Sequence, residues 1–329
     1  MSCKILLAGA FGFSLLLAPA MAGAAQSEPL NVGYNSWPGF IAWYVAIDKG
    51  WIKQAGGDVN FELLDYSASL DAFVAGKLDG VFATNADTLA MDSRGRTGVM
   101  VMVTDYSSGN DTIVAQPGVK SLKDLKGKKI GVEIRTVEHL LLLSGLRQVG
   151  MSTKDVILVD SKVDETLRLL ASGQVAAIGT WEPYASQTMM NVPGAHSIYS
   201  SALAPSLIYD VLTVTPESLR QRKTDWVKLI KVWDRVVHYI DDPKTRNDAM
   251  AIMSAHAGLT PEEFKALLAG TRLLDLEEGK LVLVKGPSIA SLYGSTGNAD
   301  AFNVTYGVYR ISKQIDSFID PSLTAAALQ

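Results

Sequence analysis

Two kinds of segment alternate along the chain from about residue 30 to residue 180. Short apolar runs, typical of buried strands, alternate with longer runs in which the apolar positions have helical spacing. Glycine follows most of the predicted helices, as expected at the position just after a helix end. We predict strands at 30–34, 59–64, 78–83, 112–115, 129–133, 156–159 and 175–179, and helices at 41–49, 69–75, 137–149 and 163–172.

The same order of elements occurs twice. Gly33 and Gly131 lie in matching strands 98 residues apart, and Gly76 and Gly173 follow matching helices 97 residues apart. Strands that alternate with helices imply parallel pairing with right-handed crossovers. We therefore predict an α/β fold with two lobes, each a mixed, mostly parallel sheet flanked by helices. Ligands bind beyond the carboxyl ends of such strands, so we expect the ligand cleft between the lobes.

The remainder of the chain, from about residue 209, has mainly helical patterns. Trp226 and Trp233 are seven residues apart on one face of a predicted helix and are interpreted as core residues. Thr260 and Pro261 have the residue types of an N-cap and a first helical turn. The pattern over 303–319 predicts a final amphipathic helix.

The first 25 residues have the pattern of an export signal. A short basic start is followed by an apolar run, then Pro19 and a row of small residues that offers cleavage after Ala22 or Ala25. About 13 apolar residues are too few to cross a ~30 Å hydrocarbon core as a helix. We therefore predict a cleavable signal peptide and a periplasmic protein. The predicted parts are a signal peptide (1–25), lobe 1 (26–113), lobe 2 (114–209) and a C-terminal helical part that returns to lobe 1 (210–329).

Composition excludes several classes of function. The chain of 329 residues carries 30 Lys and Arg against 34 Asp and Glu, a net charge of −4, which disfavours nucleic-acid binding. Cys3 is the single cysteine, and the four histidines are scattered, so we expect no metal site. The sequence contains neither a Gly-x-Ser-x-Gly motif nor a phosphate-binding glycine-rich lysine loop. We expect no cofactor and no catalytic residues.

Four groups of motifs carry a family resemblance. They are the Trp-Pro and Ala-x-Asp-Lys-Gly motifs within 37–50, Gly-Val-Glu-x-x-Thr-Val-x-His at 131–139, the Asp-Glu and Leu-Ala-x-Gly motifs within 164–173, and Thr-Trp-Glu-Pro-Tyr at 180–184. In this order and spacing, the chain resembles the nitrate/sulfonate/taurine family of periplasmic substrate-binding proteins of ABC importers, which also includes proteins for thiamine precursors. The resemblance covers essentially the whole chain after the signal peptide.

The resemblance implies a fold and a mode of action. It implies a two-lobe periplasmic binding protein (type II-like) that closes about a hinge and delivers a small molecule to a permease and an ATPase in the inner membrane. A monomer is expected. The segment 105–111 is similar to the start of the family's hinge, so the chain would cross between the lobes near 114–119 and return near 207–211. Members of the family bind nitrate, taurine, alkanesulfonates or thiamine-pyrimidine precursors, so membership leaves the ligand open.

Candidate ligand-binding residues are the polar and aromatic side chains of the strand-end loops and the hinge. They are Ser36, Trp37, Phe40, Asn85, Asp87, Asp105, Ser107, Asp111, Glu133, Thr136, His139, Trp181, Glu182 and Asp210. Carboxylates outnumber cations among the cleft loops, and a buried carboxylate needs a partner. We therefore predict a small polar ligand with an amino or other N–H donor group, zwitterions related to taurine included, between aromatic walls. The alternative is an anion such as nitrate or an alkanesulfonate, held at helix N-termini.

Other interpretations stay open. Trp37 and Trp181 are compatible with packing between lobes, Glu182 with a helix start, Asp210 with a hinge anchor and His139 with the core. For the whole chain, a sensor that presents solute to a receptor is an alternative to an importer. An enzyme is a further alternative, since a thiamine-pyrimidine synthase of the same fold uses cysteines and a histidine, but this sequence has no cysteine after Cys3.

Overall fold

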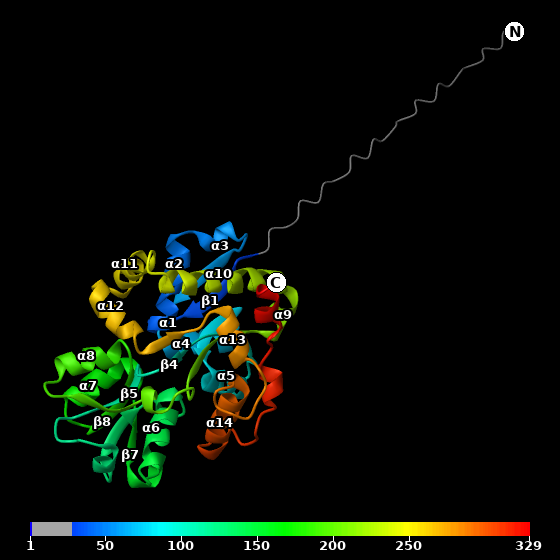
Figure 1. The fold of residues 1–329 in the computed structure, drawn as a ribbon. Coiled ribbons are helices and arrows are strands. Elements are labelled where there is room, and N and C mark those ends of the chain that lie inside the picture. The colour runs from blue at the N-terminus through cyan, green and yellow to red at the C-terminus, as the bar shows by residue number, and fades with distance from the viewer. Residues whose placement is uncertain (2–27) are drawn as a thin grey trace.

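The computed structural model describes Met1 and residues 28–329 (Figure 1). The predicted signal peptide, Met1 apart, lies outside the described residues. The strands form two sheets. In order across it, the first sheet contains β2 (Val59–Leu63), β1 (Leu30–Tyr34), β3 (Gly80–Thr84), β10 (Tyr209–Val214), β4 (Val99–Ser107) and β11 (Thr271–Leu273). The second contains β7 (Ile157–Asp160), β6 (Lys129–Val132), β8 (Ala177–Trp181), β5 (Asp111–Ala115) and β9 (His196–Ser200).

The two sheets share one plan. The strands β1 and β6 each pair in parallel with two neighbours, and an antiparallel strand follows in each sheet, β10 beside β3 and β5 beside β8. A Cβ added at Gly33 would lie 2.6 Å from Leu78 Cδ1, and one at Gly131 would lie 2.5 Å from Leu169 Cδ2. Glycine is needed at both positions because a side chain packs directly against the strand. The predicted repeat and the predicted α/β class are confirmed.

Helices cover both sheets. Around the first sheet lie α1 (Pro38–Ile41), α2 (Trp43–Asp48), α3 (Trp51–Gln54), α4 (Tyr66–Val74) and α5 (Asn85–Ser93). The second sheet carries α6 (Val137–Gln148), α7 (Thr166–Ala171) and α8 (Tyr184–Asn191). The C-terminal part contains α9 (Pro216–Gln221), α10 (Lys223–Asp241), α11 (Arg246–Ala257), α12 (Pro261–Leu268), α13 (Leu276–Val282), α14 (Leu292–Thr305) and α15 (Ser322–Ala327). We call each sheet with the helices packed on it a lobe, and Figure 1 shows the second lobe, in green, below the first.

The C-terminal part packs mainly on the first lobe. Trp226 and Trp233 of α10 are fully buried, as predicted, and the ring of Trp233 lies 5.1 Å from that of Trp43 in α2. Thr260 caps α12, as predicted, by accepting a hydrogen bond from the Glu263 amide. Helix α14 packs beside α5 and also reaches the second lobe, where the ring of Phe302 lies 5.3 Å from that of His139 in α6.

Three sequence predictions are wrong in detail. Asn85 and Asp87, which were expected in a strand-end loop, lie in the first turn of α5, because the Thr84 hydroxyl accepts a hydrogen bond from the Asp87 amide and caps a helix there. The predicted helix 41–49 is split into α1 and α2. The predicted helix 303–319 ends at Thr305, since Gly307 has a φ of 71°, and the last helix is α15.

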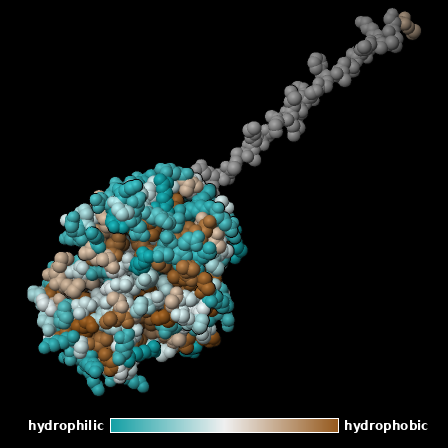
Figure 2. Space-filling view, in the orientation of Figure 1, coloured by the Kyte–Doolittle hydropathy of each residue, from teal (hydrophilic) through white to brown (hydrophobic). Residues whose placement is uncertain are grey.

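The described surface has only scattered exposed apolar side chains. Within residues 28–329, none of the helices combines the length and the hydropathy that a membrane span requires. Large exposed apolar residues, such as Leu63, Met190 and Leu281, lie on different elements. Figure 2 likewise shows apolar patches separated by polar surface on the face in view.

Candidate ligand-binding site

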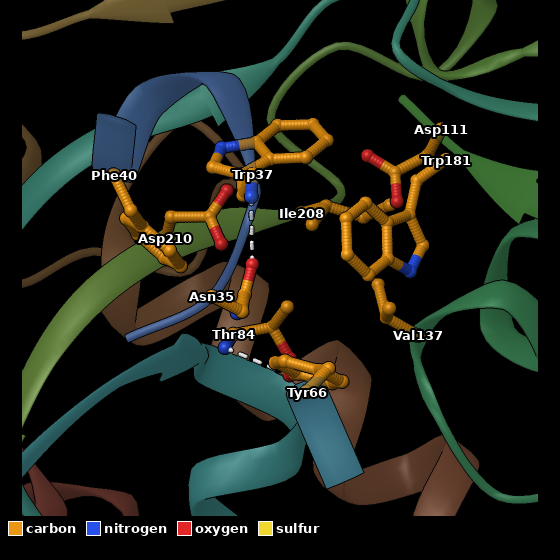
Figure 3. Close-up of a pocket in the computed structure, with 10 residues that line it drawn as sticks. All are labelled: Asn35, Trp37, Phe40, Tyr66, Thr84, Asp111, Val137, Trp181, Ile208 and Asp210. Atoms are coloured by element: carbon orange, nitrogen blue, oxygen red, sulfur yellow. Dashed lines mark hydrogen bonds between the residues drawn. The ribbon is translucent and has the colours of Figure 1, made fainter. Parts of the chain in front are cut away.

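A narrow cavity of about 20 Å³, enough for one water-sized molecule, lies between the lobes (Figure 3), so a larger ligand requires the lobes to separate further. Both lobes supply its walls, and Ile208 comes from the segment that crosses between them. The lining residues are Asn35, Trp37, Phe40, Tyr66, Thr84, Asp111, Val137, Trp181, Ile208 and Asp210. The rings of Trp37 and Trp181 meet edge to face across the two lobes at 6.1 Å. Five of the predicted site residues, Trp37, Phe40, Asp111, Trp181 and Asp210, therefore line one cavity.

The loop after β1 positions Trp37. The side-chain oxygen of Asn35 accepts a hydrogen bond from the Trp37 amide at 2.8 Å, and Pro38 begins α1, where its fixed φ suits the first helical turn. Trp37 Nε1 donates a hydrogen bond to Asp105 Oδ1 at 2.8 Å. A Cβ at Gly39 would lie 2.5 Å from Asp105 Oδ2, so only glycine lets α1 approach this carboxyl so closely.

Tyr66 and Thr84 form the floor of the cavity on the first lobe. The Tyr66 hydroxyl donates to Asp87 Oδ2 at 2.6 Å, and the Thr84 hydroxyl donates to the same oxygen at 2.8 Å. Asp87 therefore orients these two side chains from behind the wall. Tyr66 was not among the predicted site residues because the helix was expected to start at residue 69. It is the first residue of α4, three residues after the end of β2, so the strand-end rule extended to the start of that helix would have found it.

The second lobe supplies the opposite wall. Trp181 is the last residue of β8, and its ring contacts those of Tyr66, at 6.3 Å, and Tyr184, at 5.0 Å. Asp111 is the first residue of β5 and is the ladder partner of Trp181. Val137 begins α6. A hydrophobic and aromatic lining with few polar groups is typical of small-molecule sites.

Asp111 and Asp210 occupy equivalent places in the two sheets. Asp111 pairs with the last residue of β8, and Asp210 pairs with Thr84, the last residue of β3. Both carboxyls are buried and line the cavity. Asp105, the partner of Asp210 on β4, and Glu138, in the first turn of α6, are buried beside them. The interface thus contains four neighbouring carboxyl groups.

Burial changes the acidity of this cluster. It raises the pKa of Asp105 to about 6 and the pKa of Asp111 to about 7, and the Asp105 charge adds to the shift at Asp111. The pKa values of Asp210 and Glu138 are raised well above their usual range, first by burial and then by the neighbouring carboxyls. Protons therefore compete with any bound cation for these groups near neutral pH.

A wider opening of about 350 Å³ lies at the edge of the cleft. Its lining includes the predicted residues Asp87, Glu133 and Thr136, together with the cations Arg94, Arg135 and Lys162. The Ser67 hydroxyl, on the first lobe, donates to Glu133 Oε1, on the second, at 2.5 Å. Glu133 therefore links the lobes at this opening and does not line the cavity.

Two predicted residues hold the C-terminal helix and the hinge. Asn85 Nδ2 donates to the Ser295 hydroxyl of α14 at 3.1 Å. Ser107 Oγ accepts from the Asp111 amide at 3.1 Å and lies 2.7 Å from Ser201 Oγ on the returning segment. Both side chains lie outside the cavity lining and connect elements on either side of it.

Three further predicted residues also lie outside the cavity lining. His139 packs in the core against aromatic rings of the α14 region, and burial lowers its pKa to about 4. Glu182 accepts hydrogen bonds from the Ser186 amide and hydroxyl at 3.0 and 2.9 Å, which supports the start of α8. Ser36 is half-buried beside Trp37. For His139 and Glu182 the structural interpretation matches the contacts.

The cavity lacks the donor arrangement of a metal centre. Over residues 28–329, no group of three or more His, Cys, Asp or Glu side chains is arranged to hold a metal ion. What the lining offers is a desolvated aromatic chamber with carboxyl groups from both lobes. Such a chamber binds by enclosing a small molecule when the lobes meet.

Sequence relatives are binding proteins. A binding protein of Brucella abortus is 30% identical over 189 residues, which are 56% of this chain and 57% of that relative. An aliphatic sulfonates-binding protein of Escherichia coli is 24% identical over 192 residues, 57% of this chain and 59% of the relative. The chain thus matches somewhat more than half the length of these relatives.

Solved structures share the fold over nearly the whole chain. The alkanesulfonate-binding protein SsuA of Xanthomonas axonopodis pv. citri, bound to MOPS, superposes with a TM-score of 0.74 at 16% identity and covers 90% of this chain and 99% of its own. The desulfurization enzyme DSZB superposes with a TM-score of 0.63 at 17% identity and covers 91% of this chain and 99% of its own. The fold is therefore that of periplasmic binding proteins, and it also occurs in an enzyme.

The family resemblance expected from the sequence is confirmed. The family model described as NMT1/THI5 like matches residues 37–246, most of the chain. The chain belongs to the NMT1/THI5-like family.

Proposed function

We propose that this protein is the solute-binding component of an ABC importer. It captures one small polar molecule with an amino or other N–H donor group between its lobes and passes it to a permease and an ATPase in the inner membrane. We propose further that it is exported to the periplasm by a cleavable signal peptide and acts as a monomer. Its relatives described as binding proteins support this role.

One observation carries the proposal: the cavity is complete only when both lobes are in place. Trp37 and Trp181 come from different lobes, as do Asp111 and Asp210, yet all four line the same cavity. A ligand held there contacts both lobes and therefore favours their closed arrangement, because it has no such contacts when the lobes separate. Closure linked to occupancy is the property that an importer needs from its binding component.

An alkanesulfonate is the second candidate for the ligand. The sulfonate-binding relatives favour it, and so do Arg94, Arg135 and Lys162 at the wider opening. The inner cavity disfavours it, because its polar lining includes two carboxyl groups and no lysine or arginine. An anion at this place would lose hydration without gaining an opposite charge.

We propose binding without catalysis. The cavity lining has no cysteine, serine or histidine, so it contains neither a Ser–His nor a Cys–His pair. A periplasmic sensor would use the same closure. Neighbouring genes distinguish the two roles, since permease and ATPase genes beside this one favour import and a receptor gene favours sensing.

A thermal-shift screen tests the proposal. The panel contains taurine, alkanesulfonates, nitrate, bicarbonate, aminopyrimidines, amines and amino acids. A ligand at 100 times its Kd stabilises the folded state by about 2.7 kcal/mol, and we expect a shift of several degrees for an N–H-bearing compound.

Trp181→Ala serves as the site variant and Met190→Ala, on the exposed surface of the same lobe, as its control. The shift should disappear in the first and persist in the second. Stabilisation by a sulfonate alone would contradict the N–H-bearing ligand. A hit that Trp181→Ala leaves unchanged would contradict the site.

A further inference from the structure

The carboxyl cluster at the lobe interface is more buried than recognition of a single N–H group requires. Asp105, Asp111, Glu138 and Asp210 retain between 0% and 4% of their exposure. They come from four different elements, β4, β5, α6 and β10, and each of these elements contributes one carboxyl group. Asp111 and Asp210 line the cavity itself.

Several oxygens of the cluster have no partner outside it. Asp105 Oδ2, Asp111 Oδ2 and Glu138 Oε1 are buried without a donor from other residues, and the contacts of Asp105 with Asp210 and of Asp111 with Glu138 are hydrogen bonds only when a proton is shared between the two carboxyls. None of the ion pairs formed within residues 28–329 involves any of the four carboxyls. Unpaired buried carboxylates are costly, so protons or a bound cation must balance them.

The groups around the cluster do not supply that cation. From α5 it faces Asp87, and from the loop after β6 it faces Glu133, both of them acidic. Burial raises the pKa of both outer carboxyls, and the nearby cations only oppose this shift in part, Arg94 at Asp87 and Lys162 at Glu133. No lysine, arginine or histidine is among the causes that shift the pKa of the four inner carboxyls.

The remaining walls suit a positive charge. Trp37, Phe40, Tyr66 and Trp181 surround the cavity, and aromatic faces attract desolvated cations. In Figure 3 the carboxyl of Asp210 lies beside Trp37 and the carboxyl of Asp111 lies beside Trp181. The described carboxyls are not arranged as a metal site, so an organic cation fits better than a metal ion.

We infer that the ligand is a compact organic cation, an ammonium or amidinium without an anionic group, whose N–H groups lie between Asp111 and Asp210 and whose charge replaces the protons of the empty cluster. This inference rests on the proposed function and narrows its ligand class. It excludes taurine, amino acids and sulfonates, whose anionic groups would face the cluster. The raised pKa values of Asp105 and Asp111 support the exchange, because both groups hold protons in the empty site at slightly acid pH.

Matched probes test the charge. Isothermal titration compares benzylamine with benzenesulfonate, which share a ring and differ in charge, with taurine as the zwitterion. We expect benzylamine alone to bind, and to bind more tightly at pH 8 than at pH 6, by up to about tenfold per pH unit for each proton released. If benzenesulfonate binds and Trp181→Ala abolishes that binding, the inference of a cationic ligand is wrong, while the proposed function stands. If both charged probes bind and Trp181→Ala changes neither affinity, the proposed location of the binding site is wrong as well.

A second test needs no ligand. Asp111 has a raised folded pKa, so its favourable contribution to stability is complete below the unfolded value near 4 and is lost as pH rises through about 7. Asp111→Asn removes this loss, so the melting temperature of the variant relative to the parent should increase from pH 5 to pH 8. Asp58→Asn, at an exposed site, is the control and should show a constant difference. A pH-independent difference for Asp111→Asn would contradict a cluster that exchanges protons.

Discussion

The two lobes have the same strand plan but bring different walls to the cavity. Each places an aspartate opposite the last residue of its third parallel strand, Asp210 in the first lobe and Asp111 in the second. The first lobe adds most of the aromatic surface and a hydrogen-bonded floor, whereas the second adds mainly Trp181 and Val137. Each lobe thus contributes one carboxyl to the cavity, whereas the aromatic lining comes chiefly from the first lobe.

Because of this difference, we expect that closure of the lobes and selectivity for the ligand depend on different residues. The aspartate pair has no function in either lobe alone, because neither carboxyl completes the cavity without the other. The aromatic wall of the first lobe is already assembled through contacts within that lobe, such as Trp37 with Asp105 and Tyr66 with Asp87. We expect a ligand to dock first on this wall and to meet Trp181 as the lobes close.

Removing both aspartates should have the largest effect. Asp111→Asn and Asp210→Asn should each weaken binding of the best N–H-bearing ligand at least tenfold, and together at least a hundredfold, or about 2.7 kcal/mol. Titration calorimetry of the single and double variants provides the measurement. Equal losses of affinity in the two single variants would support equivalent roles for the two aspartates. Unchanged affinity in either single variant would contradict that equivalence.

The paired glycines provide a stability test of the same symmetry. Gly33→Ala and Gly131→Ala each place a methyl group about 2.5 Å from a leucine carbon, so both should destabilise their lobe by about 1–3 kcal/mol. Urea unfolding followed by fluorescence measures the loss. Gly118→Ala, where an added Cβ meets no atom within 4 Å, is the control. A large loss at one glycine only would mean that the lobes are packed differently.

The facing tryptophans should differ in effect. Trp181→Ala should weaken ligand binding at least tenfold, about 1.4 kcal/mol, because Trp181 is the main apolar wall of the second lobe. Trp37→Phe should weaken it less, since the ring stays and only the hydrogen bond to Asp105 is lost. Calorimetry on both variants makes the comparison, and a greater loss for Trp37→Phe would show that orientation of Asp105 matters more than the wall.

Loss of the hydrogen bond between Ser67 and Glu133 at the wider opening should have the smallest effect on ligand affinity. The sequence predicted Glu133 as a ligand-binding residue, but its carboxylate accepts a hydrogen bond from the Ser67 hydroxyl outside the cavity. We now expect a loss below tenfold, from weaker closure. In a double-mutant cycle, Ser67→Ala should have little further effect once Glu133 is replaced. Additive losses would mean that the two residues act separately.

Much of the fold could be predicted from the sequence because its signals are local. Strand periodicity and the glycines at 33, 76, 131 and 173 identify the repeated unit without tertiary information. The prediction of a helix over 303–319 is wrong because the apolar pattern continues past Gly307, whose φ of 71° ends the helix. The split of the 41–49 helix depends on packing, which a periodic pattern does not encode.

The site was predicted less completely, for a different reason. Position after a strand correctly brought Trp37, Asp111 and Trp181 to one cavity. Position alone does not say whether a side chain faces the cavity or a neighbouring helix, so His139 and Glu182 were included although they face other elements. The burial of Glu138 beside the aspartates follows from how α6 enters the interface, which only the structure reveals.

The most direct test of the account is the distance between the lobes with and without ligand. Spin labels are attached to cysteines introduced by Met190→Cys and Leu281→Cys, both at exposed sites on different lobes, in a chain that begins at residue 26 and so lacks Cys3. Double electron–electron resonance then gives the distance distribution with the strongest compound of the thermal screen. We predict that saturating ligand makes the distribution shorter and narrower, and that Asp111→Asn prevents the change. An identical distribution with and without a bound ligand would contradict capture by closure.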